Sequence, residues 1–76
     1  MQKLTIKQKI VLDFIEWFIS SNGYSPTIKE IQEELKFKYP NSVFKILNLL
    51  EEKKYISTVS GKSRTIKILR GVEDEY

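Results

Sequence analysis

The side chains best suited to recognition chemistry in this sequence lie between residues 41 and 48. The outward-facing members of this segment are Asn41, Ser42, Phe44, Lys45 and Asn48. On a helix, the spacing 41, 44, 45 and 48 keeps such residues on one side. An asparagine amide can pair with two atoms of an adenine edge, and a lysine can donate to guanine acceptors. The segment therefore predicts a helix that reads base edges in a DNA major groove.

Phe44 is the unusual member of this set, because an exposed phenylalanine lowers solubility unless something covers it. Two explanations stay open. The ring contacts the methyl group of a thymine, or it packs against a neighbouring hairpin or a partner subunit.

A second candidate segment is a run of five small or basic residues, Ser60, Gly61, Lys62, Ser63 and Arg64. Small side chains let the backbone approach a phosphate, and the two cations release counterions on binding. Arginine also favours narrow A·T-rich minor grooves. We expect this loop to contact the DNA backbone or minor groove; the alternative is an ordinary solvent-exposed turn.

The charge distribution supports a phosphate-facing surface. Residues 1–35 carry a net charge of −1, residues 36–70 carry +7 and residues 71–76 carry −3, which gives the total of +3. A strongly basic half on a small domain suits nucleic acid, although a solvated lysine-rich surface explains the same numbers. The further candidates for DNA-backbone contact are Thr27, Lys29, Lys38, Tyr39, Lys53 and Lys54.

The composition excludes several classes of function. The chain has no cysteine and no histidine, which removes disulfide scaffolds, zinc fingers and thiol or imidazole catalysis. Adjacent glutamates on a helix diverge, so we find no nucleophile–base set and expect no enzyme, no cofactor and no metal. No apolar run approaches the roughly 20 residues of a membrane helix, and no signal peptide is visible, so we expect no membrane partner and a cytoplasmic location.

The elements that must position these side chains begin with a helix capped by Thr5. Its apolar residues recur every three or four positions: Ile10, Val11, Phe14, Ile15, Phe18 and Ile19. Trp17 lies at the edge of this stripe, and we expect it to pack against the fold. The helix should end near Gly23, which can adopt the left-handed conformation.

Two further helices follow with only a short turn between them. Thr27 and Glu30 form a capping-box pattern ahead of the second helix, whose buried face is Ile28, Ile31 and Leu35. After residues 36–39, Pro40 suits the first position of a third helix. Its inward residues are Val43, Ile46, Leu47 and Leu50. Two helices joined in this way form a helix-turn-helix.

The last part of the chain predicts a hairpin, here called the wing. Residues 55–59 and 65–69 are rich in β-branched and aromatic types, with residues 60–64 as the loop. The predicted fold class is α+β, mainly α: a winged helix-turn-helix of three helices and a C-terminal β-hairpin wing. Residues 1–70 form the domain, and we expect the acidic tail, residues 71–76, to be disordered.

The sequence resembles the N-terminal DNA-binding domain of the LexA repressors, from about residue 4 to residue 69. The residues that carry the resemblance are Leu4-Thr5, Gln8, Asp13, Ile15, Ile19-Ser20, Gly23, Pro26-Thr27, Glu30-Ile31, Leu35, Phe37, Pro40-Asn41, Leu47, Leu50, Lys53 and Val59 to Arg64. The resemblance implies a third helix in the major groove and a wing beside it. It also implies base contacts from Asn41, Ser42, Phe44 and Lys45, with backbone contacts from Lys53 and the wing.

Three departures from that family have consequences. The family usually has glycine where Lys36 stands, so either Lys36 takes a left-handed conformation or the turn differs. Acidic or small polar residues are typical where Phe44 and Lys45 stand, which implies a different operator. The peptidase domain that supplies dimerisation and self-cleavage in LexA repressors has no counterpart in these 76 residues, so we expect no self-cleavage from them.

We therefore expect a sequence-specific regulator of transcription that binds double-stranded DNA, a LexA-like repressor domain. Its helix at 40–53 reads the major groove, and its wing at 60–64 contacts the backbone or minor groove. We expect two weakly associating copies on a palindromic site. The alternative is a small LexA-like protein-interaction module, of the kind a mobile element could encode, which binds a host protein through Phe44, Trp17 or the acidic tail.

Overall fold

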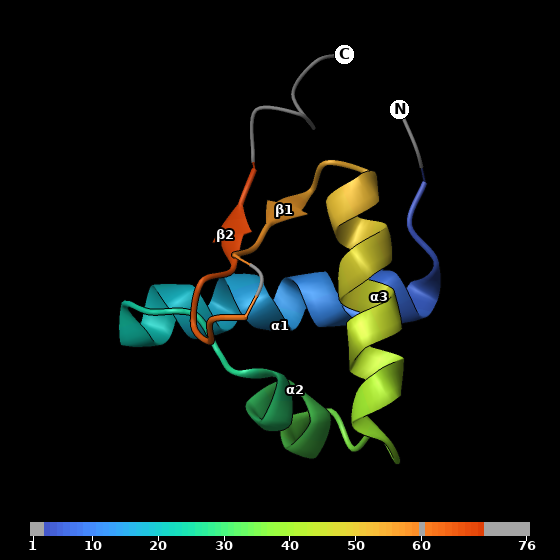
Figure 1. Cartoon of the computed structure of the whole chain (residues 1–76), viewed down its shortest axis with the longest axis horizontal. Coiled ribbons are helices and arrows are strands. Elements are labelled where there is room, and N and C mark those ends of the chain that lie inside the picture. Colours follow the sequence, from blue (N-terminus) through green and yellow to red (C-terminus); the bar gives the residue numbers. More distant parts are fainter. Residues whose placement is uncertain (1–2, 60, 70–76) are drawn as a thin grey trace.

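The computed structural model describes residues 3–59 and 61–69, where three helices precede a two-stranded antiparallel sheet. The elements are α1 (Ile6–Asn22), α2 (Ile28–Glu34), α3 (Pro40–Glu52), β1 (Ile56–Ser57) and β2 (Lys67–Ile68). Helix α3 contacts α1, α2 and β1, and it crosses α1 with the hairpin alongside (Figure 1). This arrangement confirms the predicted fold class, a mainly α winged helix-turn-helix.

The helix starts agree with the sequence signals. In α1 the Thr5 hydroxyl accepts from the Gln8 backbone N–H at 3.1 Å, and the Gln8 side chain accepts from the Thr5 N–H at 3.0 Å. Thr27 and Glu30 form the same reciprocal pair at the start of α2. Each box satisfies two backbone donors that a helix start leaves unpaired. Helix α3 has no side-chain cap, and Pro40 occupies its first turn as predicted.

A residue with positive φ stands within two positions of the last residue of each helix. Gly23 (φ 82°) ends α1, as predicted, with its N–H donating to the Ile19 carbonyl at 2.8 Å. Lys36 (φ 60°) follows α2 and Lys54 (φ 69°) follows α3. Of the two conformations considered for Lys36, the chain therefore adopts the left-handed one.

Helices α2 and α3, which Lys36 and Lys54 follow, each terminate in a Schellman motif. After α2, the Phe37 N–H donates to the Gln32 carbonyl at 2.9 Å, and the Lys36 N–H donates to the Glu33 carbonyl at 3.3 Å. The same two bonds recur after α3, where Tyr55 donates to Leu50 and Lys54 donates to Glu51, both at 3.0 Å. The motif satisfies carbonyls at the helix end, although its left-handed position strongly favours glycine. A lysine there costs conformational energy but places a cation at the negative end of each helix.

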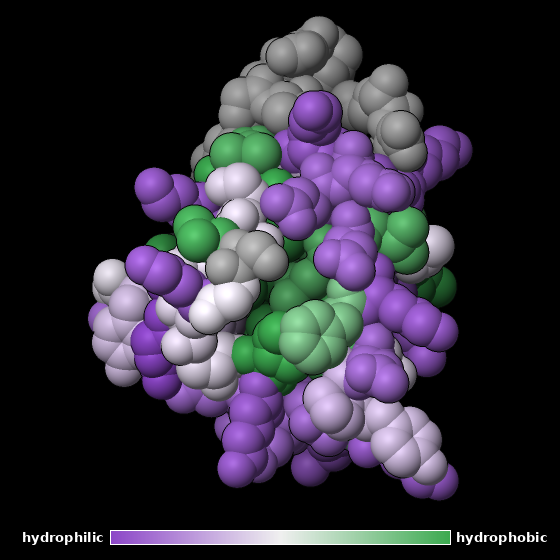
Figure 2. Space-filling model, in the orientation of Figure 1, coloured by the Kyte–Doolittle hydropathy of each residue, from purple (hydrophilic) through white to green (hydrophobic). Residues whose placement is uncertain are grey.

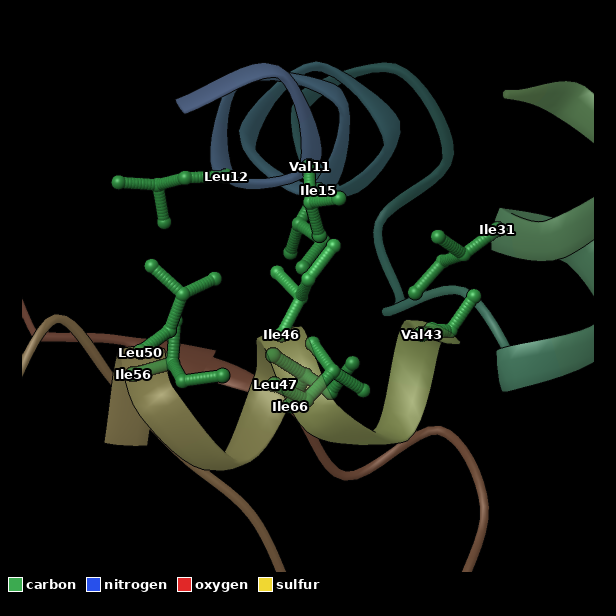
Figure 3. Close-up of a cluster of buried hydrophobic side chains, with 10 residues drawn as sticks. All are labelled: Val11, Leu12, Ile15, Ile31, Val43, Ile46, Leu47, Leu50, Ile56 and Ile66. Carbon is green, nitrogen blue, oxygen red and sulfur yellow. The ribbon is translucent and has the colours of Figure 1, made fainter. Parts of the chain in front are cut away.

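The core lies where α3 meets α1, α2 and the base of the hairpin (Figure 3). Its buried members are Val11, Leu12, Ile15, Ile31, Val43, Ile46, Leu47, Leu50, Ile56 and Ile66. The four inward residues predicted for α3 are all among them. One expectation for α1 is wrong: Ile10 is 47% exposed, while Leu12 is buried. The buried face of α1 is Gln8, Val11, Leu12 and Ile15, and Ile10 lies outside that run of spacings.

The hairpin ladder is shorter than the five-residue strands predicted. Ile56 pairs with Ile68 and Ser57 pairs with Lys67. The next ladder donor, the Val59 N–H, bonds instead to the Thr65 hydroxyl at 3.0 Å. The Ile66 N–H faces away from β1 and donates to the hydroxyl of buried Ser25 at 3.2 Å. This bond ties the wing to the connection between α1 and α2. No helix of the described residues is long and apolar enough to cross a membrane. The predicted acidic tail, residues 71–76, lies outside the described residues.

Candidate nucleic-acid interface

The outward face of α3 carries the five residues predicted to read bases. Asn41, Phe44, Lys45 and Asn48 are exposed, and Ser42 is half-buried. The four exposed residues lie opposite the apolar residues that hold α3 in the core, because the two sets alternate along the helix at spacings of three and four. The helix is anchored on three sides by α1, α2 and β1. Its polar face is therefore fixed in orientation and open to solvent.

A groove of about 670 Å³ runs between this face and the wing. Its lining includes Phe44, Asn48, Lys29, Lys62 and Ser63. Figure 2 shows a hydrophobic hollow beside α3, surrounded by hydrophilic residues. Phe44 remains 49% exposed although wing residues line the same groove. About half of this side chain therefore lies in solvent.

The wing loop is closed by one side-chain bond and one backbone turn bond rather than by a longer ladder. The Thr65 hydroxyl accepts from the Val59 N–H at 3.0 Å, and the Lys62 N–H donates to the Val59 carbonyl at 3.2 Å. Gly61 has φ 79°, a conformation that favours glycine. Gly61, Lys62 and Ser63 are exposed at the tip. Ser60, also predicted as a DNA contact, lies outside the described residues.

Arg64, the other predicted wing contact, is turned back onto the body of the domain. Its guanidinium donates to Glu30 at 2.9 and 3.2 Å and to the Ser25 carbonyl at 3.1 Å. The guanidinium carbon lies 4.8 Å from the centre of the Tyr24 ring. Arg64 itself has φ 57°, a left-handed conformation. In this structure Arg64 clasps the wing to the start of α2.

Glu30 serves both the helix cap and this clasp. Its carboxylate accepts from the Thr27 backbone N–H at 2.9 Å while it pairs with Arg64. The Thr27 backbone bond, followed by the bond from Arg64, holds the pKa of the Glu30 carboxyl below its ordinary value. Protonation of Glu30 would therefore weaken the start of α2 and the attachment of the wing together.

Lys53 is likewise engaged within the fold. Its ammonium donates to the Lys3 carbonyl at 2.7 Å and to the side chain of buried Gln8 at 2.8 Å. These bonds join the end of α3 to the start of α1. The remaining predicted backbone contacts differ in availability. Lys29 and Lys54 are exposed, the Lys38 ammonium lies 5.6 Å from the Tyr39 ring centre, and the Thr27 hydroxyl is occupied by the cap.

Comparison with known proteins agrees with this geometry. The family model described as LexA DNA binding domain matches residues 1–65. The chain belongs to the LexA DNA-binding domain family. The matched residues include α1, α2, α3 and β1, and they extend through the wing loop to Thr65.

The relatives of this LexA-type domain are repressors of greater length. The LexA repressor of Glaesserella parasuis serovar 5 is 45% identical over 74 residues, which are 97% of this chain and 34% of the repressor. The LexA repressor of Desulfatibacillum aliphaticivorans is 41% identical over 70 residues, 92% of this chain and 34% of the repressor. The chain thus spans about a third of the length of the curated relatives it matches.

The LexA-type wing is held in place by residues that the sequence patterns did not single out. Ser25, Tyr24 and Thr65 each contact the wing or its clasp. The capping pattern predicts only the helix-cap role of Glu30, and it gives no sign of the ion pair with Arg64. Among the residues the structure describes, no group of three or more metal-ligating side chains is placed to hold a metal ion.

Proposed function

We propose that this domain binds double-stranded DNA as the operator-binding part of a LexA-type repressor. The observation that carries the proposal is the exposed polar face of α3, held beside a basic wing in a member of the LexA DNA-binding domain family. A protein helix of this kind fits the major groove, where each base pair presents a distinct pattern of donors and acceptors. The basic surface supplies the phosphate contacts that carry much of the affinity.

In the proposed complex α3 enters the major groove with its N-terminal half against the bases. Asn41, Ser42, Phe44, Lys45 and Asn48 face base edges, because they occupy the outward side of the helix. Phosphates are held by Lys29, Lys38, Lys54 and Lys62, whose side chains are exposed. The wing tip at residues 61–63 lies against the backbone or the minor groove. Two copies bind the two halves of a palindromic site.

A titration of the domain against LexA-type operators and a random duplex, at two salt concentrations, tests this function. We expect preference for one operator class at both salts, with both affinities falling as salt rises. Asn41→Ala should lower operator affinity while leaving random-duplex binding near its original value, since that binding depends on phosphate contacts. Asn22→Ala, at the far end of α1, is the matched control. Equal binding to all duplexes, or none at low salt, would contradict the proposal.

A protein-interaction role is the second candidate, and it is favoured by the 60% exposure of Trp17 beside two other aromatic rings. Phe44→Ala distinguishes the two roles at the α3 face. Loss of operator affinity assigns Phe44 to DNA readout. Retention of operator affinity together with loss of a protein partner assigns it to the second role.

A further inference from the structure

An aromatic recess lies on the surface between α1 and α2. The rings of Phe14, Trp17 and Phe18 are mutual neighbours, with centroid separations of 5.8, 5.9 and 6.5 Å. They line a recess of about 310 Å³ together with residues of α2. Phe14 and Phe18 are half-buried and Trp17 is largely exposed. Phe14 and Phe18 therefore pack against the fold, while Trp17 presents its ring surface to solvent.

The α2 side of the recess is acidic. Glu33 and Glu34 contribute to its lining, and neither has an ion-pair partner within residues 3–59 and 61–69. Among the residues that the structure describes, no lysine or arginine lines the recess. Aromatic faces and carboxylates both attract cations, the rings through their quadrupole and the carboxylates through their charge. The recess thus combines two groups that favour the same kind of ligand.

The adjoining surface already holds a cation in this way. The Arg64 guanidinium lies over the Tyr24 ring and pairs with Glu30 at 2.9 Å. Tyr24 in turn contacts Phe18 at a centroid separation of 5.8 Å, so the two aromatic groups are continuous. Glu30 itself borders the recess, so Arg64 engages one of its carboxylates. The recess adds Glu33 and Glu34 beside the rings of α1, which repeats the combination of ring and carboxylate next to Arg64.

We propose that this recess docks an arginine side chain presented by a protein partner. Arginine fits better than lysine because its planar guanidinium can stack on an indole and still donate to a carboxylate. The recess shares no lining residue with the groove beside α3. A partner held here leaves the proposed DNA-reading face free, so the two binding events are compatible. The proposal concerns a separate surface and stands whether or not the domain binds an operator.

The test uses Trp17 as a reporter, because it is the one tryptophan in the sequence. An Ala/Gln helical peptide with leucine and arginine four residues apart is titrated into the domain while the Trp17 indole N–H is followed by NMR. A twin peptide with citrulline replaces the guanidinium by a neutral group of similar shape. We expect a saturable shift with the arginine peptide and binding weaker by up to about fivefold with its twin, the upper range for an exposed ion pair.

Variants separate the recess from general charge attraction. Glu33→Gln with Glu34→Gln should weaken arginine-peptide binding, whereas Glu51→Gln with Glu52→Gln removes the same charge from the end of α3 and should not. Trp17→Ala should abolish peptide-induced shifts at Phe14 and Phe18 without lowering operator affinity. Equal binding of both peptides, or equal effects of the two double variants, would overturn the proposal. A Trp17 shift that depends on protein concentration alone would assign the surface to self-association and also overturn it.

Discussion

At the scale of single residues, Phe44 tests whether an apolar side chain reads DNA. It is about half exposed on the outward face of α3, next to Asn48 and Lys45. If the ring covers a thymine methyl, replacing that thymine by deoxyuridine removes the contact and nothing else. We expect about a fourfold loss of affinity at one position of each half-site, since burying one such carbon is worth roughly 0.8 kcal/mol. Binding assays with singly substituted operators measure this.

Phe44→Ala provides the control for that measurement. The variant should bind thymine and deoxyuridine operators equally, because it has no ring to cover the methyl group. Leu49→Ala, which shortens another exposed apolar side chain of α3, should keep the difference. A deoxyuridine effect of equal size in wild type and Phe44→Ala would place the thymine contact on another residue.

The roles of individual residues were predictable where their partners are near in sequence. The outward face of α3 followed from helical spacing, and the capping box of α2 followed from Thr27 and Glu30, three positions apart. For α1 the sequence predicted Thr5 as the cap, and the structure adds Gln8 as its reciprocal partner. Arg64 and Lys53 are different, since their partners lie 34 and 45 residues away. A local pattern shows only an available cation at these positions. The folded chain decides that each one bonds to another part of the domain.

At the scale of elements, the left-handed lysines predict sites for stabilisation. Lys36 and Lys54 hold positions that cost an ordinary residue about 1 kcal/mol relative to glycine. Lys36→Gly should therefore raise the free energy of unfolding by about 0.5–1 kcal/mol, after the greater entropy of unfolded glycine is counted. Urea denaturation measures the change.

Gly23→Ala is the opposite experiment at the end of α1. Nothing lies within 4 Å of an added Cβ, so the variant reports the conformational cost without a clash. We expect a loss of about 1 kcal/mol. A gain at Gly23, or a loss at Lys36, would show that side-chain contacts outweigh backbone conformation at these helix ends.

The clasp between the wing and α2 predicts a pH dependence. Because the folded domain lowers the Glu30 pKa, the ionised carboxylate stabilises the fold above the ordinary glutamate pKa of about 4.3. That contribution is lost as pH falls through the lower folded value. Wild type should exceed Glu30→Gln in stability at pH 7, and the difference should shrink towards pH 2. Thermal melts of both proteins across this range measure it, and a constant difference would contradict the role of Glu30 ionisation.

The hairpin also shows how far element prediction extends. Residue types located both strands and the loop, but the ladder has only two pairs among the described residues, since the Val59 N–H bonds to the Thr65 hydroxyl. Ser25 accepts the Ile66 N–H, which faces away from β1. A serine before a proline gave no sign of this role, since it acts on a strand 41 residues away. The wing is thus attached to the rest of the domain through the Ser25 hydroxyl and Arg64, while its ladder and the Thr65 hydroxyl hold the hairpin itself together.

At the scale of the whole molecule, charge placement predicts the salt dependence of DNA binding. The basic residues 36–70 carry +7, yet Lys53 and Arg64 are bonded within the fold. The proposed phosphate contacts are then Lys29, Lys38, Lys54 and Lys62. Each phosphate neutralised contributes about −0.9 to the slope of log K against log salt, so one domain on one half-site should give about −4.

The salt slope also shows whether Arg64 stays bonded to Glu30 in the complex or moves to a phosphate. Lys62→Gln should reduce its magnitude by about one, whereas Arg64→Gln should lower affinity through the wing position and leave the slope unchanged. A slope near −5, reduced in magnitude by about one in Arg64→Gln, would mean that Arg64 leaves Glu30 for a phosphate when the wing meets DNA. Measurements on a single half-site keep the result independent of how two copies associate. The domain would then carry its full positive charge to DNA only after giving up the bonds that hold its wing and helix ends in the free state.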